Sequence, residues 1–347
     1  MSRYAEAHKL ANVTGPGDAR PTALQVIKDE GLLGKLSDKV FLVTGVSSGI
    51  GLETVRALHT TGAHVFGTVR DMPKGQQVIN QILDEEHPGG GKINLINMSL
   101  DNFASICAGA QEFLTKSKGK LNAIIANAGI MATPFGKTTD GFEQQFATNH
   151  LSHFLLFHLL KSALLASATP EYPSRYVSIS SLAHMFNPVH LGDYNYDNTP
   201  YSPWDAYSQS KTANIWFANA IERRYGSQHL HATSVHPGGI ATSGLAKHLT
   251  ADDPIVATMT PDTFRTYKSA EQGAATQVYA AVSEEWKHKG GRYLASMVEQ
   301  KSRVETRKVE GMYEHANEGW AEWVYDVEGE ERLWVDSLGI VGLKDGE

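Results

Sequence analysis

The sequence predicts an α/β fold in which a parallel β-sheet carries helices on both faces. Short apolar runs alternate along the chain with segments of helical periodicity, and one of these runs leads directly into a turn with three glycines. Parallel neighbours need a long crossover, which a helix supplies and which is right-handed. We therefore expect a doubly wound, Rossmann-type sheet of seven strands in a single domain.

The expected strands are runs rich in apolar and β-branched residues, separated by helix-like segments. They lie at 39–44, 63–69, 93–98, 121–127, 175–180, 231–236 and 292–295. A chain of 347 residues permits one large domain or two ordinary ones. Nothing between residues 37 and 300 resembles a linker, which favours a single domain over that range.

Two appendages flank this domain. Residues 1–36 are expected to form an N-terminal arm, irregular at first and then helical over 22–30. Residues 301–347 are expected to form a C-terminal extension outside the alternation of strands and helices. Its tryptophans are interpreted as packing anchors rather than as a binding platform. They are Trp320, Trp323 and Trp334.

The composition excludes several classes of function. A net charge of −7 and a pI near 6.1 give no broad attraction for nucleic acids or anionic membranes. No apolar segment reaches membrane-spanning length, and the N-terminus lacks the apolar core of a signal peptide. The lone Cys107 is compatible with a reducing compartment. We expect a cytoplasmic protein with no nucleic-acid partner and no membrane span.

The glycine-rich stretch Val43-Thr44-Gly45-Val46-Ser47-Ser48-Gly49-Ile50-Gly51 joins the first strand to a helix. Its glycines would allow a tight turn, close approach of the backbone to a pyrophosphate, and packing of the helix on the strand. The helix N-terminus adds unpaired N–H groups and the positive end of a dipole. The spacing G-x-x-x-G-x-G differs from the commoner dinucleotide motif, and most glycine-rich turns bind nothing. The stretch therefore favours a dinucleotide site without deciding it.

The end of the second strand bears on which dinucleotide would bind. An acidic residue there would contact the ribose hydroxyls of NAD, whereas an arginine accommodates the 2′-phosphate of NADP. The strand ends in Val69-Arg70, and the Arg70 guanidinium suits a phosphate. Asp71 is expected to cap the following turn. The sequence therefore prefers NADP, although Arg70 could also be an ordinary solvated charge.

Tyr207 and Lys211 are four residues apart in a segment of helical periodicity, so their side chains would share one face. A neighbouring ammonium group lowers the pKa of a tyrosine from its usual value of about 10, which would let Tyr207 transfer a proton. Ser181 follows the strand at 175–180, where its hydroxyl could hold a substrate oxygen against Tyr207. Taken singly, each feature also fits ordinary surface or turn chemistry.

Several motifs occur together in one order along the chain: Thr44-Gly45-x-x-x-Gly49-Ile50-Gly51, Asn127-Ala128-Gly129, Asn149, Ser181, Tyr207-x-x-x-Lys211 and Pro237-Gly238. In this combination the chain resembles the short-chain dehydrogenase/reductase superfamily over roughly residues 37–300. Stretches such as Asn149-His150-Leu151-Ser152-His153-Phe154 are similar to the retinol-dehydrogenase-like branch, which has many fungal members.

The resemblance implies an NADP(H)-dependent oxidoreductase that transfers a hydride between nicotinamide and a carbonyl or alcohol carbon. Tyr207 would be the general acid in reduction and the base in oxidation. Lys211 would lower the pKa of Tyr207 and bind the nicotinamide ribose. Ser181 would orient the reacting oxygen, and Asn149 would hold a water that relays protons through Lys211.

The resemblance also implies a set of cofactor-binding residues. They are Gly45, Ser47, Ser48, Gly49, Ile50, Gly51, Arg70, Ser99, Leu100, Asn127, Ala128, Gly129, Tyr207, Lys211, Pro237 and Gly238. Two positions depart from the family pattern. Ser99 stands where an aspartate often contacts adenine, and Ser152 replaces a common glycine. Serine at position 99 still offers a hydrogen bond.

The substrate is expected to be a small lipophilic alcohol or ketone, because residues 182–206 and 240–268, which would wall the cleft, are rich in aromatic and aliphatic side chains. A fungal secondary-metabolite ketone, a retinoid or a steroid would fit. A homodimer through the helices of Asn149 and Tyr207 is possible, although the C-terminal extension could interfere. The alternatives are an idle NADP(H)-binding sensor or interaction protein, and an enzyme that reduces a double bond.

Four histidines are given no catalytic or metal role. His150, His153 and His158 follow one helical pattern without a carboxylate or cysteine at metal-ligand spacing, so no metal is expected. His184 lies close to Ser181 in the sequence, but we assign it a packing role because Tyr207 already has a lysine to tune its pKa.

Overall fold

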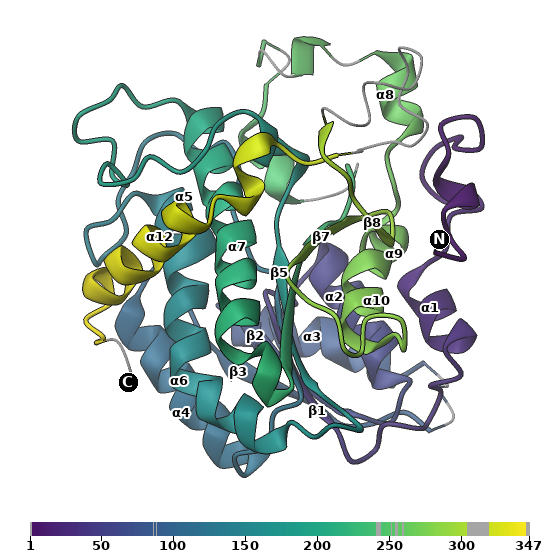
Figure 1. Ribbon diagram of the computed structural model, residues 1–347. Helices are drawn as coiled ribbons and strands as arrows, with labels where there is room; N and C mark the ends of the chain where they lie inside the picture. The colour runs from purple at the N-terminus through teal and green to yellow at the C-terminus, as the bar shows by residue number, and fades with distance from the viewer. Residues whose placement is uncertain are drawn as a thin grey trace.

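The computed structural model describes residues 2–85, 87, 89–240, 244–250, 252–253, 256–258, 260–303 and 319–344. Its centre is one sheet with the strand order β3-β2-β1-β4-β5-β6-β7-β8 (Figure 1). The strands are β1 Val40–Thr44, β2 His64–Val69, β3 Ile93–Asn97, β4 Ala123–Ala126, β5 Ser174–Ile179, β6 Leu230–His236, β7 Arg292–Ala295 and β8 Val298–Glu299. The first seven are parallel and correspond to the seven expected runs, which confirms the predicted doubly wound sheet.

The sequence did not predict the eighth strand. β8 pairs antiparallel with β7 across a two-residue turn, Ser296-Met297, in which both residues have positive φ. Such a turn normally carries Asn-Gly or a similar pair, so the sequence gives no hairpin signal here.

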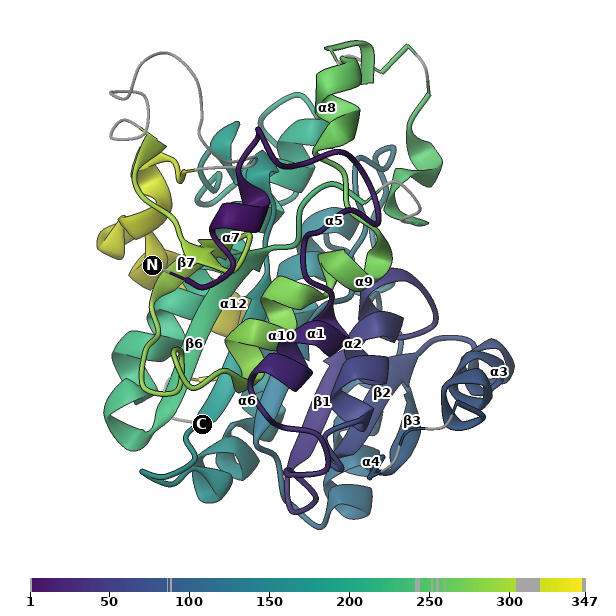
Figure 2. The same ribbon diagram turned by 90° about the vertical axis from the view of Figure 1, so that its right-hand side faces the viewer.

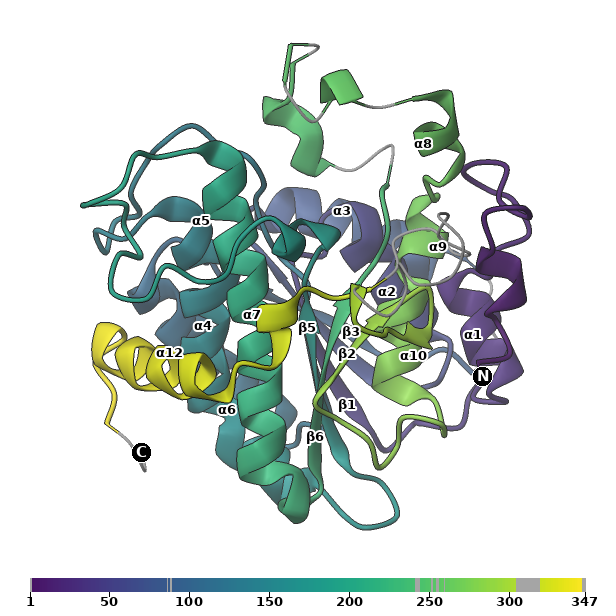
Figure 3. The same ribbon diagram turned by 45° about the horizontal axis from the view of Figure 1, so that its top comes forward.

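Helices cover both faces of the sheet, as Figures 2 and 3 show from two directions. One layer contains α4 Phe103–Ser117, α6 Ser152–Ser167 and α7 Pro203–Tyr225, with α12 Val327–Ile340 packed outside α7. The other contains α1 Ala23–Asp29, α2 Gly49–His59, α3 Met72–Leu83, α9 Ala270–Gly273 and α10 Ala275–Val282. The short helices α5 Gln144–Phe146 and α8 Pro261–Arg265 lie in connecting segments.

The burial of β1 explains why its sequence is apolar throughout. Phe41 and Val43 face one core cluster, and Val40 and Leu42 face the other. A parallel strand covered on both faces has no polar side, so its signal is a continuous apolar run rather than an alternation.

The short helix expected over 22–30 is confirmed as α1. The Thr22 hydroxyl accepts a hydrogen bond from the backbone N–H of Gln25 at 3.2 Å and so caps the helix. Val26 and Ile27 are buried, and the helix packs against α2 and α10 (Figure 2).

The tryptophans of the C-terminal segment are packing anchors, as the sequence indicated. Trp334 is buried against Phe154 and Phe217, and the Arg224 guanidinium lies 4.2 Å from the centroid of its ring. One helical turn earlier, Glu330 is buried and accepts a hydrogen bond from Asn219 at 2.7 Å. The extension is therefore integrated into the layer formed by α6 and α7.

The order of the strands defines where a ligand would bind. The chain moves outward from β1 through β2 to β3, then returns to β4 on the opposite side of β1. Ligands of open α/β sheets bind at the carboxyl ends of the strands beside such a reversal. The glycine turn follows β1 and the Asn127-Ala128-Gly129 motif follows β4, so the two motifs meet there. No helix among the described residues is long and apolar enough to cross a bilayer.

Candidate active site

The glycines after β1 are required by backbone geometry. Gly45 and Gly49 have φ values of +71° and +61°, which disfavour residues with a side chain. A Cβ on Gly51 would lie 2.3 Å from the Gly45 carbonyl oxygen, and one on Gly45 would lie 2.8 Å from the Cβ of Ala128. The helix can therefore approach the strand and the β4 loop only because these positions lack side chains.

The N-terminus of α2 fits a phosphate group. The Ser48 side chain does not cap this helix, whereas α1, α3 and α4 are capped by the side chains of Thr22, Asp71 and Asn102. A Cβ on Gly49 would contact nothing within 4 Å, so space is open beside the first residue of the helix. Open backbone N–H groups at the positive end of the helix dipole are what the diphosphate of a dinucleotide needs.

Thr44 joins the glycine turn to the loop after β4. Its Oγ1 accepts hydrogen bonds from the backbone N–H groups of Asn127 and Ala128, both at 2.9 Å. The Asn127 side chain donates to the Thr44 carbonyl, also at 2.9 Å. The structure thus brings these two predicted motifs together at the carboxyl edge of the sheet.

Asp71 caps α3, as predicted. Its carboxylate accepts a hydrogen bond from the backbone N–H of Lys74 at 3.0 Å. Arg70, directly before it, is exposed at the end of β2, and its side chain has no hydrogen bond or ion pair within the described part of the chain. The guanidinium is therefore available to a ligand beside the glycine turn, which is tied to β2 by the bond from the Gly45 N–H to the Thr68 carbonyl at 3.1 Å.

Ser99 and Leu100, at the end of β3, are half-buried and buried. The Ser99 hydroxyl donates to the Asp101 carboxylate at 2.5 Å. A carboxylate is therefore linked to the Ser99 hydroxyl at this end of β3.

Tyr207 and Lys211 share one face of α7, and both are buried. Ser181, which follows β5, hydrogen bonds to the Tyr207 side chain. The Lys211 Nζ donates to the Ile179 carbonyl at 3.0 Å and lies 5.5 Å from the centroid of the Tyr207 ring. The structure therefore brings Ser181, Tyr207 and Lys211 together at the end of β5.

The pKa of Tyr207 differs from the sequence-based expectation. Burial raises it to about 12, with the hydrogen bond from Ser181 opposing this shift. The Lys211 ammonium is engaged with a backbone carbonyl and does not offset the burial. The four-residue spacing correctly predicted that the two side chains share one helix face, but it could not predict how deeply the phenol is buried.

Asn149 lies in a π-helical segment at Ala147–Leu151, a local widening often found at functional sites. Its side-chain oxygen accepts from the Ile130 N–H at 2.9 Å, and its amide donates to the Ile130 carbonyl at 3.0 Å and to Ser210 at 2.9 Å. A Cβ on Gly129 would lie 2.9 Å from Asn149 Oδ1 and 3.4 Å from Lys211 Nζ. Asn149 and Lys211 thus converge on the loop after β4.

His153 contributes to this arrangement in a way that the sequence did not indicate. It is buried, which lowers its pKa to about 4 and leaves the ring neutral. Its Nδ1 lies 3.0 Å from the Asn149 carbonyl and its Nε2 lies 2.9 Å from Thr44 Oγ1. Since Thr44 Oγ1 already accepts two bonds, it donates to Nε2 and the ring donates from Nδ1. His153 therefore links β1 to the Asn149 segment.

His184 has a structural role, as expected. Its Nδ1 lies 2.7 Å from the Ser181 carbonyl and its Nε2 accepts from the Ala321 N–H at 3.3 Å. Burial lowers its pKa to about 4. Among the residues that the structure describes, no cluster of three or more potential metal ligands is found.

Buried Lys211 predicts a pH dependence of stability. Burial lowers its pKa to about 7, whereas an unfolded lysine titrates near pH 10.4. Between these values the unfolded chain binds more protons, so the free energy of unfolding should rise from pH 7 to pH 9, by up to about 1.4 kcal/mol per pH unit for this group. Urea unfolding at several pH values measures the slope, and Lys211→Met should reduce it. An identical slope in that variant would contradict the assignment.

The comparisons with known proteins agree with this geometry. The family model described as short chain dehydrogenase matches residues 39–253. The chain belongs to the short-chain dehydrogenase/reductase family. It is 43% identical to the short-chain dehydrogenase/reductase prx1 of Penicillium roqueforti, covering 99% of this chain and 96% of the relative, and 43% identical to the oxidoreductase calI of Penicillium decumbens, covering 99% of each.

The similarity to the retinol-dehydrogenase-like branch is confirmed as well. This short-chain dehydrogenase/reductase is 34% identical to retinol dehydrogenase 12 of Mus musculus over 75% of its own length and 78% of the relative. Among solved structures, an uncharacterized protein from Mycobacterium paratuberculosis aligns with a TM-score of 0.65 and 28% identity, covering 88% of this chain and 94% of the other. The Pseudomonas aeruginosa RhlG complex with NADP shares the fold, with a TM-score of 0.59 and 23% identity over 76% of this chain and 96% of RhlG.

Proposed function

We propose that this short-chain dehydrogenase/reductase is an NADP(H)-dependent enzyme that transfers a hydride between nicotinamide and a lipophilic ketone or alcohol. One observation carries the proposal: Tyr207 is buried at the carboxyl edge of the sheet, hydrogen bonded to Ser181 and on one helix face with Lys211, and the side chains of Lys211 and Asn149 both lie close to Gly129. A protein that only bound the cofactor would not need this convergence of proton-bearing groups.

The cofactor would lie along the carboxyl edge of the sheet. The turn with Gly45, Ser47, Ser48, Gly49, Ile50 and Gly51 would hold its diphosphate, and the groups at Ser99, Leu100, Asn127, Ala128 and Gly129 would line its adenosine side. Pro237 and Gly238 follow β6 and would flank the nicotinamide. When bound, the cofactor supplies or accepts the hydride.

The side chains around Tyr207 would handle the proton. In reduction, Ser181 would donate a hydrogen bond to the carbonyl oxygen and hold it beside the phenol, and Tyr207 would give that oxygen its proton. A pKa of about 12 means that Tyr207 holds its proton at neutral pH. Efficient transfer of this proton needs a lower pKa, and in the complex with the cofactor the Lys211 ammonium would lower it. Lys211 and the Asn149 segment would restore the proton from solvent.

The preference for NADP rests on Arg70. An exposed guanidinium at the end of β2, without a protein partner among the described residues, suits the 2′-phosphate and replaces the acidic residue that NAD requires there. The preference for a lipophilic substrate rests on aromatic rings near Tyr207. The Trp204 ring lies 6.0 Å from that of Tyr207 and 6.4 Å from that of Phe186, and Phe186 is 53% exposed.

A cofactor-oxidation screen tests this function. Purified protein should oxidise NADPH with one or more members of a panel of lipophilic ketones and aldehydes, and products should be identified by mass spectrometry. Alcohol products support carbonyl reduction. Saturated carbonyl products from enones would show double-bond reduction instead. NADPH binding without turnover on any member of the panel would favour the sensor.

A further inference from the structure

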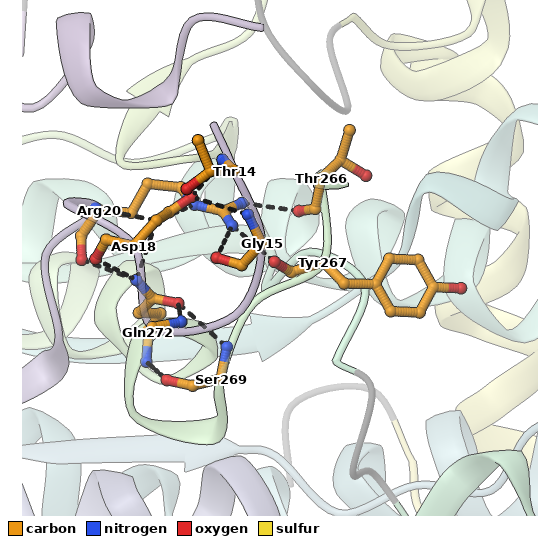
Figure 4. Close-up of polar contacts among 9 residues, drawn as sticks. Thr14, Gly15, Asp18, Arg20, Thr266, Tyr267, Ser269 and Gln272 are labelled. Atoms are coloured by element: carbon orange, nitrogen blue, oxygen red, sulfur yellow. Dashed lines mark hydrogen bonds and ion pairs between the residues drawn. The ribbon is translucent and has the colours of Figure 1, made fainter. Parts of the chain in front are cut away.

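The N-terminal arm is fastened to the segment before α9 by buried polar groups (Figure 4). Arg20 is only 3% exposed, and its guanidinium donates to the carbonyl oxygens of Thr266 at 2.6 Å and Tyr267 at 2.5 Å. It also forms an ion pair with Asp18 at 2.8 Å, and both of these side chains are almost completely buried. The arm thus fixes the backbone on the N-terminal side of Lys268.

Gln272 fixes the backbone on the other side. Its amide donates to the Asp18 carboxylate at 3.1 Å and to the Arg20 carbonyl at 3.0 Å, and its side-chain oxygen accepts from the Gly17 N–H at 3.0 Å (Figure 4). Residues 266–272 are therefore held by the arm from both ends.

Lys268 lies between these attachment points, and its side chain turns toward the cofactor-binding loop. It is 1% exposed, and its backbone N–H donates to the Gly239 carbonyl at 2.8 Å. A Cβ on Gly238 would lie 3.2 Å from its Nζ, and Gly238 itself has a φ of +98°. The ammonium group therefore lies directly against the Pro237-Gly238 motif.

The same segment adjoins the glycine turn. A Cβ on Gly273 would lie 2.8 Å from side-chain carbons of both Ile240 and Ile50. Ile240 pairs with Lys268 in an isolated β-bridge, and Ile50 lies in the first turn of α2. The Lys268 segment and the start of α2 therefore meet at Gly273. The segment that carries Lys268 thus lies between the expected nicotinamide loop and the expected diphosphate site.

Within the described residues, the Nζ of Lys268 has no hydrogen bond or ion pair, and the nearby Asp18 is already paired with Arg20. Burial lowers the pKa of Lys268 to about 7, and Arg20 adds to this effect. A buried ammonium without a partner is costly and attracts an anion. The positive end of the α2 helix dipole also attracts an anion to this region.

We propose that Lys268 is an anion-binding residue of the cofactor cleft, that its ammonium group pairs with the diphosphate of the bound dinucleotide, and that the N-terminal arm positions it through Arg20. The proposal rests on the proposed cofactor function. The diphosphate is chosen over the nicotinamide carboxamide because the carboxamide is neutral and would leave the buried charge unpaired.

Two ligands test the proposal by titration with the full-length protein. NADPH contains the diphosphate, whereas adenosine 2′-phosphate contains only the adenosine and the 2′-phosphate. Lys268→Met should weaken NADPH binding, followed by NADPH fluorescence, by about tenfold or more. It should leave the binding of adenosine 2′-phosphate, measured by competition, unchanged. Arg70→Ala serves as the matched control, because it should weaken both ligands.

Thermal unfolding of the cofactor-free variant separates binding from structure. Because Lys268→Met removes an unpaired buried charge, its unfolding temperature should equal or exceed that of the native chain. The paired change Asp18→Asn with Arg20→Met removes the arm's ion pair without leaving one charge alone, and should also weaken NADPH binding, by less than Lys268→Met does.

Several results would overturn the inference. If Lys268→Met bound NADPH as tightly as the native chain does, the proposed diphosphate contact would be rejected. It would also be rejected if the variant lost affinity for both ligands in parallel and unfolded at a lower temperature, because that result would indicate a structural lysine. Unchanged NADPH affinity in the paired Asp18 and Arg20 variant would remove the role of the arm. If the native chain bound no NADPH at all, the proposed function itself would fail.

Discussion

Tyr207→Phe is expected to lower turnover by about 10² to 10⁴, while NADPH binding stays close to that of the native chain. The change removes one hydroxyl from a fully buried ring and keeps the ring's packing against Trp204. The lost group is the one that would give its proton to the substrate oxygen. Steady-state kinetics with the best substrate of the carbonyl panel, together with an NADPH titration, measure the two effects separately.

Tyr194→Phe provides a matched control for this experiment. Tyr194 is half-buried, and its hydroxyl donates to Asp336 at 2.6 Å in the contact with α12. Its loss should lower stability without changing the rate per folded molecule. If Tyr207→Phe turned over as fast as this control, Tyr207 would not be the proton donor, and a catalytic water or another side chain would have to be sought.

Arg70→Ala should weaken NADPH binding about tenfold or more and leave NADH binding nearly unchanged. A charge-assisted hydrogen bond to phosphate contributes about 1.5–3 kcal/mol to binding. NADH lacks the 2′-phosphate and cannot form this bond, so the substitution should not weaken its binding. Because Arg70 is exposed and has no partner among the described residues, its removal should not disturb the fold. The ratio of the two dissociation constants is the measured quantity.

The NADH titration is the internal control for that variant. A general disturbance of the site, for example through the Asp71 cap of α3, would weaken both dinucleotides to the same degree. Such a result would reject Arg70 as the group that selects the phosphate. Raising the salt concentration should reduce the native preference for NADPH, because an exposed ion pair is screened.

The sequence predicted the parts of the molecule that depend on local pattern. β1 was recognisable because both of its faces are buried, and Asp71 because an Asx cap forms within three residues. The shared face of Tyr207 and Lys211 follows from helix geometry alone. The catalytic roles stay predictions until the variants are measured.

The features that escaped prediction depend on distant parts of the chain. The pKa of Tyr207 is set by burial beneath several elements, which no four-residue spacing can express. His153 can link β1 to the Asn149 segment only because β1 brings Thr44 within hydrogen-bond distance of its ring. Lys268 has no motif of its own, and the two residues before it are bound by Arg20 from the opposite end of the chain.

The placement of α12 bears on how two copies of the chain could associate. In the enzymes that this protein resembles, subunits often join through the helices equivalent to α6 and α7. Here Trp334 already fills the apolar surface that Phe154 and Phe217 present, so the polypeptide supplies its own cover for that surface. At this point on α6 and α7, a second copy of the chain would meet Trp334 and α12 rather than Phe154 and Phe217.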